Sequence, residues 1–144
     1  MCLIIILFKH RLIDGTFPDT NRLIPDAFDY ELDLDAHYLL NAIDRVSLLT
    51  NEQNNIIKLD MSDEKVVLSS YMQEIGSVEE ILDKSFYKGT PISISFSSKY
   101  ATDAIRAFNE PKIKILFTGE MKPFIIKDFE KDDVIQLVLP VRTF

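Results

Sequence analysis

Two stretches of the chain share one pattern and together decide the fold: Asp33-Leu-Asp-Ala-His-Tyr-Leu-Leu-Asn-Ala-Ile-Asp-Arg45 and Ser95-Phe-Ser-Ser-Lys-Tyr-Ala-Thr-Asp-Ala-Ile-Arg-Ala107. Three identities recur at an offset of 62 residues: Tyr38 with Tyr100, Ala42 with Ala104 and Ile43 with Ile105. Each stretch follows an alternating strand pattern, passes a helix-capping residue (Asp35 or Ser97) and continues with apolar residues at helical spacing. A chance match is the alternative, but the common order of elements favours an internal duplication.

Further strand patterns follow each of the two predicted helices. The predicted strands cover residues 30–34, 55–61, 65–71 and 75–82 in the first half, and 92–96, 112–117, 122–127 and 134–141 in the second. The chain is therefore predicted to be an α+β fold, a duplicated β-α-β-β-β unit with two helices packed on antiparallel sheets. A doubly wound nucleotide-binding fold is disfavoured, because strands and helices do not alternate regularly and no glycine-rich phosphate loop is present.

The composition limits the classes of protein that the chain can belong to. Its 144 residues suit one domain, and 47% hydrophobic with 27% charged residues excludes a disordered chain. The net charge of −7 argues against a protein held to nucleic acid by its overall field. The single cysteine, Cys2, excludes an internal disulfide framework and favours a cytoplasmic location. The apolar run 2–8 is too short for a membrane span and is predicted to be a short buried strand.

Catalytic chemistry finds little support in the sequence. Cys2 has no nearby histidine in the sequence, and no nucleophile elbow is present. With only His10 and His37 as further nitrogen ligands, zinc sites are nearly excluded, and we predict no cofactor and no metal. Paired carboxylates do occur, and a small carboxylate-dependent metal hydrolase is the least favoured hypothesis; the pairs are Glu79 with Glu80, Asp132 with Asp133, and Asp60 with Asp63.

The helix faces and the last strand suggest binding surfaces instead. The outer helix faces carry a few polar and basic residues: His37, Asn41 and Arg45 on the first helix, and Lys99, Thr102 and Arg106 on the second. These faces are either solvated surface or suited to weak phosphate contact. Residues 134–141 are apolar on both faces and contain Pro140, which marks a strand end or a sheet edge. An apolar strand edge can build a groove for an extended peptide.

Five segments carry motifs of a known family: Arg11-Leu-Ile-Asp-Gly-Thr-Phe-Pro-Asp-Thr-Asn-Arg-Leu-Ile-Pro25, Leu48-Leu-Thr-Asn-Glu52, Glu79-Glu-Ile-Leu82, Ser97-Ser-Lys-Tyr100 and Leu137-Val-Leu-Pro-Val-Arg142. Through them the chain resembles the C-terminal domain of the bacterial β sliding clamp, the processivity subunit of DNA polymerase III. The resemblance implies a DNA-clamp fold without catalysis. In the full-length family, three such domains make a protomer, and two protomers close as a homodimer around duplex DNA with the helices lining the hole.

The resemblance also implies roles for particular residues. A site for linear motifs of the DNA polymerase III alpha subunit and of the clamp loader would use Pro18, Leu23, Ser97, Tyr100, Met121, Pro123, Leu137, Leu139, Pro140, Val141 and Arg142. The residues facing DNA would be Arg45, Lys99 and Arg106. The dimer interface would use Leu48, Leu49, Glu74 and Glu80; from the sequence alone, one of the two leucines is expected outside the core, either covered by a loop or offered to a partner.

The match to the family is partial, and it suggests a domain organisation. The first clamp domain and nearly all of the second are missing, so residues 1–24 are interpreted as a remnant of the preceding domain with an interdomain connector. Residues 25–144 would be the C-terminal clamp domain. The alternative function is a free-standing peptide-binding module derived from a clamp.

Overall fold

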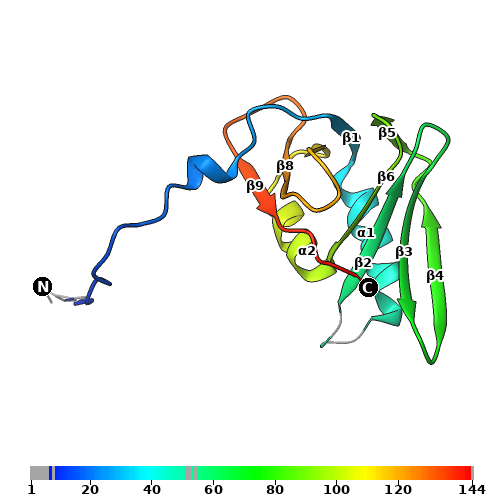
Figure 1. The fold of residues 1–144 in the computed structure, drawn as a ribbon, viewed down its shortest axis with the longest axis horizontal. Coiled ribbons are helices and arrows are strands. Elements are labelled where there is room, and N and C mark those ends of the chain that lie inside the picture. The colour runs from blue at the N-terminus through cyan, green and yellow to red at the C-terminus, as the bar shows by residue number, and fades with distance from the viewer. Residues whose placement is uncertain (1–6, 8, 51–52, 54, 144) are drawn as a thin grey trace, which may run out of the picture.

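The computed structural model describes residues 7, 9–50, 53 and 55–143, and its elements follow the predicted order (Figure 1). In chain order they are η1 (Thr20–Leu23), β1 (Tyr30–Asp35), α1 (Ala36–Val46), η2 (Ser47–Leu49), β2 (Ile56–Met61), β3 (Val66–Met72), β4 (Gly76–Ile81), β5 (Ser85–Lys88), β6 (Ile92–Ser97), α2 (Ser98–Arg106), β7 (Lys112–Phe117), β8 (Phe124–Asp128) and β9 (Ile135–Val138). Most of the predicted strand at residues 2–8 lies outside the described residues.

Both helices begin at the predicted capping residues. The Asp35 side chain accepts a hydrogen bond from the backbone N–H of Tyr38 at 2.8 Å. At the equivalent position Ser97 accepts from the N–H of Tyr100 at 3.4 Å. Each side chain thereby satisfies one of the N–H groups that a helix start leaves without an intrahelical partner. In both halves, a capping side chain therefore marks the point at which the strand ends and the helix begins.

The strand pairing confirms the duplication. It also shows that each half pairs its first strand with the other half. One sheet has the order β5-β1-β7-β8-β9 and the other the order β4-β3-β2-β6, and every pairing is antiparallel. The first strand of each unit thus pairs with the second strand of the other unit, β1 with β7 and β6 with β2. The two sheets are equivalent apart from β5, which is added at the edge next to β1.

The core lies between the sheets and the two helices. The helices contact each other, and α1 packs on β1 and β3 while α2 packs on β6 and β9. Three phenylalanine rings join the two sheets: Phe96 of β6 meets Phe124 of β8 edge to face at 5.3 Å, and Phe124 lies 5.1 Å from Phe117 of β7. All three side chains are buried, so one apolar cluster spans both units.

Among the described residues, β5 is the strand that the sequence pattern missed. It has only four residues, and it ends before Gly89, whose φ of 147° suits glycine. A Cβ on Gly89 would also lie 2.6 Å from a ring carbon of Tyr30. The Tyr87 side chain is partly buried, which raises its pKa to about 12. Its hydroxyl donates to the carbonyl of Thr90 at 2.5 Å and so connects the end of β5 to the residue after Gly89. The break predicted near residues 88–90 is therefore a turn that follows a short strand.

The last strand is shorter than the predicted range 134–141. It ends at Val138, because Pro140 has no N–H to donate to a ladder. The chain then crosses to the other sheet, where Pro140 forms an isolated bridge with Phe96 and the N–H of Val141 donates to the carbonyl of Ser95 at 2.7 Å. The predicted strand end at the proline is confirmed, and the segment after it links the free edges of β9 and β6.

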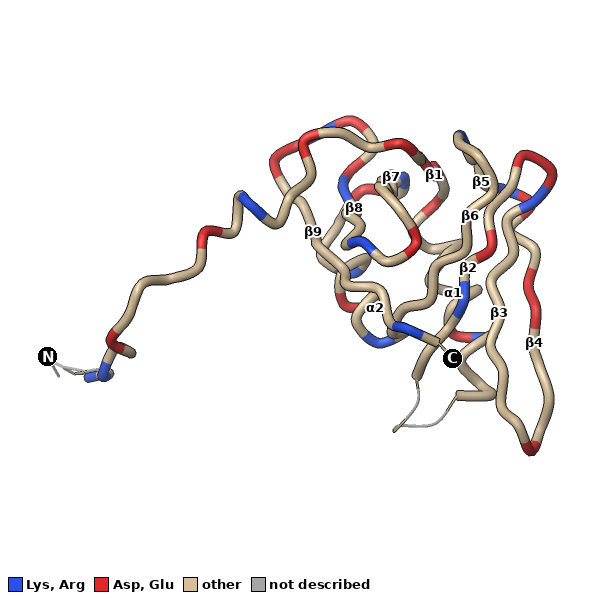
Figure 2. The backbone as a smooth tube through the Cα atoms, in the orientation of Figure 1, with Lys and Arg blue, Asp and Glu red and all other residues tan. Residues whose placement is uncertain are grey.

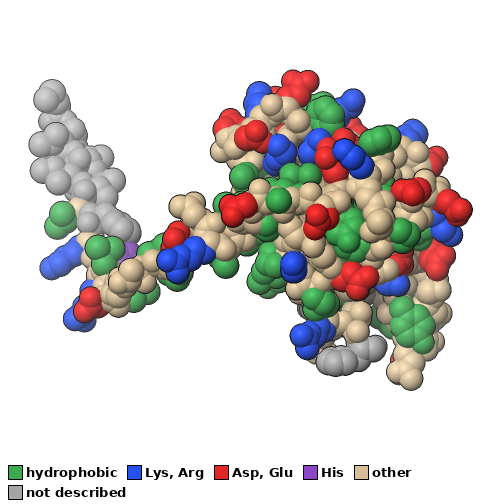
Figure 3. All heavy atoms as spheres, turned by 45° about the horizontal axis from the view of Figure 1, so that its top comes forward, with side chains coloured by type: hydrophobic (Ala, Val, Ile, Leu, Met, Phe, Trp, Pro, Cys, Tyr) green, Lys and Arg blue, Asp and Glu red, His purple; other side chains and the backbone are tan. Residues whose placement is uncertain are grey.

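The N-terminal part of the chain is an arm that extends away from the body (Figure 1). Its apolar side chains are exposed, among them Leu12, Ile13 and Phe17, and Figure 3 shows hydrophobic groups along its length. The origin of residues 1–24 as a remnant of a preceding domain stays a prediction. No helix in the described part of the chain is long and apolar enough to span a membrane.

Candidate functional site

Exposed apolar side chains gather around strand β9, which is a free edge of its sheet. Leu139 follows this strand and is 64% exposed, and Tyr100, on the neighbouring helix α2, is 66% exposed. Met121, in the turn between β7 and β8, is half exposed. We call the surface formed by Tyr100, Met121 and residues 137–142 the rim. Large apolar side chains left this accessible are typical of an interaction surface.

The predicted peptide-binding residues do not all meet in one cavity. Met121, Val141 and Arg142 line a groove of about 340 Å³. Leu137, Pro140 and Pro123 are half-buried in the same part of the fold, outside that groove. Pro18 and Leu23 lie on the arm, which extends away from the body (Figure 1). The geometry thus brings the C-terminal part of the predicted set together and leaves the N-terminal part apart.

The surroundings of Ser97 differ from those of the other residues predicted to bind a peptide. Its side chain is buried, and its hydroxyl donates to the side-chain oxygen of Asn55 at 2.8 Å while it caps helix α2. Both contacts are internal, so Ser97 fixes the start of the helix that carries Tyr100.

The three residues predicted to face DNA differ in their surroundings. Arg45 donates from two of its nitrogens to the two carboxylate oxygens of Glu80, which ties helix α1 to the edge strand β4. Lys99 and Arg106 are exposed on α2, and neither forms an ion pair with another described residue. In Figure 2 the Lys and Arg positions are interspersed with Asp and Glu positions over the body of the chain.

The predicted dimer-interface residues surround strand β4, the other free edge near helix α1. Leu48 is 81% exposed and Leu49 is half-buried, which confirms that one of the two leucines lies outside the core. Glu74 is exposed in the turn before β4. The hydrogen bonds from Arg45 hold the pKa of Glu80 below its ordinary value of 4.5. Glu80 therefore stays charged at the sheet edge under neutral conditions.

The carboxylate pairs form no metal-binding cluster within the described residues. Asp60 pairs with Lys58 at 2.9 Å, and Asp132 pairs with Lys127. Among the described carboxylates, Asp33 is the one whose pKa is raised, chiefly by burial, but the Lys114 ammonium lies 3.6 Å from it. The ammonium group of Lys114 thus occupies the space beside Asp33 that a bound metal cation would need.

A groove that the sequence did not predict lies on the outer face of the four-stranded sheet. Its volume is about 460 Å³, and it is lined by Ile56, Ile57, Lys58, Ser69, Ser70, Tyr71, Ser95, Arg142 and Thr143. Only Arg142 among these residues was predicted as a site residue. The alternation Ile92-Ser-Ile-Ser-Phe-Ser97 was the available signal, since it places a row of hydroxyl groups along one sheet face.

Comparison with known proteins identifies the fold and its family. The family model for the DNA polymerase III beta subunit, C-terminal domain, matches residues 21–142. The chain belongs to this family. It is 45% identical over 138 residues to the beta sliding clamp of Staphylococcus aureus, a match that covers 95% of this chain and 37% of that protein.

Solved sliding-clamp structures agree with the fold. The sliding clamp of Bacillus subtilis is 40% identical with a TM-score of 0.83, and the match covers 93% of this chain and 36% of that one. The beta chain of Streptococcus pneumoniae is 34% identical with a TM-score of 0.85, covering 92% and 36%. The chain therefore has the fold of one sliding-clamp domain and spans about a third of the length of these relatives.

Proposed function

We propose that this chain acts as the C-terminal domain of a DNA replication processivity factor. In this proposal it is a non-catalytic part of a homodimeric ring that encircles duplex DNA, and its rim binds linear motifs of the DNA polymerase III alpha subunit and of the clamp loader. Membership of the sliding-clamp family supports the proposal. The observation that carries it is the exposure of Leu139, Tyr100 and Met121 around a free sheet edge.

The other two predicted surfaces fit the same proposal. Helix α2 offers Lys99 and Arg106 to the phosphate backbone, and so few cations favour weak contact that permits sliding. Strand β4 offers an unpaired edge beside Leu48 and Glu80, which suits pairing with a basic strand of another protomer. Pro18 and Leu23 would join the peptide site if the arm folds back toward the rim.

A peptide-binding measurement tests the proposal. A fluorescent peptide carrying the clamp-binding motif of the alpha subunit is titrated with the chain and with Leu139→Ala, and anisotropy reports the affinity. Since full burial of a leucine side chain stabilises a complex by about 1.5–3 kcal/mol, we expect the variant to bind about tenfold more weakly or worse.

The matched control for this measurement is Phe86→Ala. Phe86 is 67% exposed on strand β5, at the opposite edge of the same sheet. This change should leave the affinity unaltered. Equal binding by the wild type and Leu139→Ala would remove the rim as the peptide site.

A further inference from the structure

The 460 Å³ groove on the outer face of the four-stranded sheet, which we call the Lys58 groove, is locally positive in an acidic chain. Among the described residues that line it, the charged ones are Lys58 and Arg142, and none carries a carboxylate. The chain as a whole carries a net charge of −7. Hydroxyl groups of Ser69, Ser95 and Thr143 also line the groove and can donate hydrogen bonds. Its chemistry therefore suits an anionic group.

The duplication provides a comparison within the same molecule. Lys58 of β2 lies opposite Ser95 of β6, and Lys114 of β7 lies opposite Asp33 of β1, in equivalent cross-strand positions. Lys114 forms ion pairs with both Glu31 and Asp33. In one sheet the lysine is therefore neutralised by the opposing strand, and in the other sheet a serine takes the place of the acid.

This exchange of acid for serine extends along the strand. The outward residues Glu31, Asp33 and Asp35 of β1 correspond to Ser93, Ser95 and Ser97 of β6. Within the described residues, Lys58 keeps one ion-pair partner, Asp60, and Arg142 is in no ion pair. Both side chains are accessible, so a ligand can reach the Arg142 guanidinium directly and would share the Lys58 ammonium with Asp60, which lies 2.9 Å from it.

The Lys58 groove is continuous with the rim. Lys58, Ser95, Arg142 and Thr143 also line the neighbouring groove that contains Met121 and Val141 of the rim. The C-terminal segment lies between the two grooves, and two contacts hold it against β6. The N–H of Val141 donates to the carbonyl of Ser95, and the hydroxyls of Ser95 and Thr143 lie 3.3 Å apart. A peptide on the rim can therefore extend directly into the Lys58 groove.

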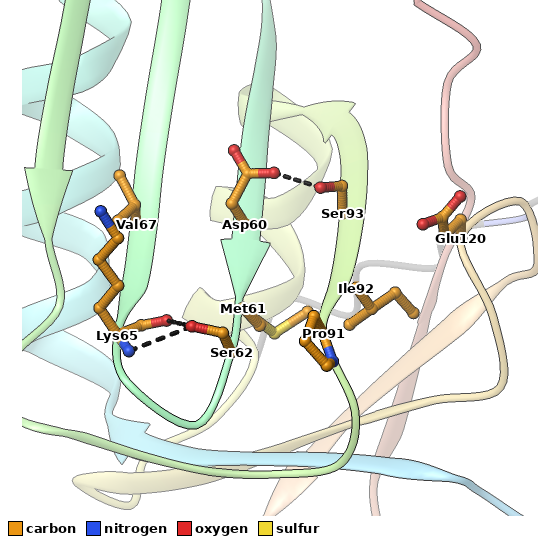
Figure 4. A pocket seen from close by; sticks show the side chains of 9 residues that line it. All are labelled: Asp60, Met61, Ser62, Lys65, Val67, Pro91, Ile92, Ser93 and Glu120. Carbon is orange, nitrogen blue, oxygen red and sulfur yellow. Dashed lines mark hydrogen bonds between the residues drawn. The ribbon is translucent and has the colours of Figure 1, made fainter.

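The neighbouring groove at the rim also contains a carboxylate, that of Glu120, so the positive character is confined to the Lys58 groove. Figure 4 shows the next cavity, of about 290 Å³, where Asp60 points toward Ser93 and Glu120 faces them from the turn between β7 and β8. Two carboxylates and one lysine, Lys65, line this cavity. An anionic group is thus favoured next to Lys58 and Arg142 and disfavoured at this acidic cavity.

We propose that the Lys58 groove receives an acidic side chain of the peptide that binds at the rim. The inference rests on the proposed peptide-binding function and adds to it a charge preference for the residues that flank the apolar anchors. The partner is an extended protein segment with aspartate or glutamate beside its apolar motif.

Two peptides with the same apolar motif test this inference. One carries three aspartates at each end of the alpha-subunit motif and the other carries three asparagines. The wild type should bind the aspartate peptide more tightly, by about two- to fivefold for each charge pair formed at low ionic strength, with the preference decreasing as salt is added. Lys58→Gln should reduce the preference, which is measured as the ratio of the two affinities, so that any effect common to both peptides cancels.

Control variants separate this inference from the proposed function. Lys88→Gln removes an equal charge from strand β5 of the other sheet and should keep the preference. Leu139→Ala should weaken both peptides alike. Equal affinity of the wild type for both peptides, or an unchanged preference in Lys58→Gln, would overturn the groove assignment while Leu139 still reports on the rim. If neither peptide binds, both the assignment of the Lys58 groove and the proposed peptide-binding function are overturned.

Discussion

At the scale of single residues, the charged contact between Arg45 and Glu80 connects two surfaces that sequence reasoning treated separately. Arg45 was predicted to face DNA and Glu80 to face another protomer, and the structure pairs them with each other. The guanidinium bridges helix α1 and the edge strand β4, so the two surfaces share one electrostatic contact. A change at either residue is therefore expected to affect both the helix face and the sheet edge.

The Arg45–Glu80 contact predicts a pH dependence of stability. Because hydrogen bonds from Arg45 lower the pKa of Glu80, its stabilising contribution is fully present above pH 4.5 and is lost as the pH falls through the lowered pKa. In Glu80→Gln, the midpoint of thermal unfolding should fall less steeply below pH 4.5 than in the wild type. Calorimetric scans at several pH values measure the slope.

The matched variant for this measurement is Glu79→Gln, which neutralises the neighbouring carboxylate on the same strand. Glu79 is exposed and forms no ion pair with another described residue. Its replacement should keep the wild-type slope. If Glu80→Gln and the wild type lose stability in parallel below pH 4.5, the contact does not contribute in solution.

At the scale of elements, Phe124 of β8 contributes to the packing of the two sheets on each other. Its ring contacts Phe96 and Phe117, and it is 2% exposed. Phe124→Ala removes the ring that joins the two sheets and should lower the free energy of unfolding by about 3–5 kcal/mol. Urea denaturation followed by circular dichroism measures this change.

The exposed ring of Phe86 on β5 serves as the comparison for Phe124. Surface substitutions usually change stability by no more than about 0.5 kcal/mol, so Phe86→Ala should unfold at nearly the wild-type urea concentration. A small effect of Phe124→Ala, close to that of Phe86→Ala, would mean that the two sheets are held together by other contacts.

Most elements could be predicted from the sequence because their signals are local. Alternating apolar residues and the capping side chains Asp35 and Ser97 placed the strands and helices within a few residues. Strand β5 was missed because its polarity does not follow its burial: Ser85 and Tyr87 are the half-buried residues, while the apolar Phe86 is exposed. The exchange of first strands between the units could not be predicted, since pairing between distant strands leaves no signal in a single sequence.

The candidate site was predictable only in part, for a related reason. The apolar edge and Pro140 indicated the rim directly. The Lys58 groove requires knowing that Ser95 and Arg142 lie side by side, and these residues are far apart in the sequence. The assignments carried by family resemblance, such as those of Pro18 and Leu23, stay predictions.

At the scale of the whole molecule, the distribution of charge predicts very weak DNA binding. The helix surface offers Lys99 and Arg106, while the chain carries a net charge of −7. We expect no measurable binding of a short duplex at physiological salt. At low salt, two phosphate contacts would give a logarithmic salt slope of about −2, which fluorescence anisotropy can measure.

A double variant identifies the residues responsible for any binding at low salt. Lys99→Glu with Arg106→Glu should abolish it, whereas Lys88→Glu, on strand β5, should have a much smaller effect. Tight duplex binding that persists as salt is raised would contradict a domain whose hold on DNA depends on a closed ring.

The exchanged first strands have a consequence for how the two halves could have arisen. A single unit on its own would lack the strand that completes its sheet, because β1 lies beside β7 and β6 lies beside β2. An ancestral unit of this kind would have been stable only as a symmetric pair in which each copy lent its leading strand to the other. In the present chain one backbone joins the two units, and a backbone nick in the linker at residues 89–91 should yield two pieces that remain associated.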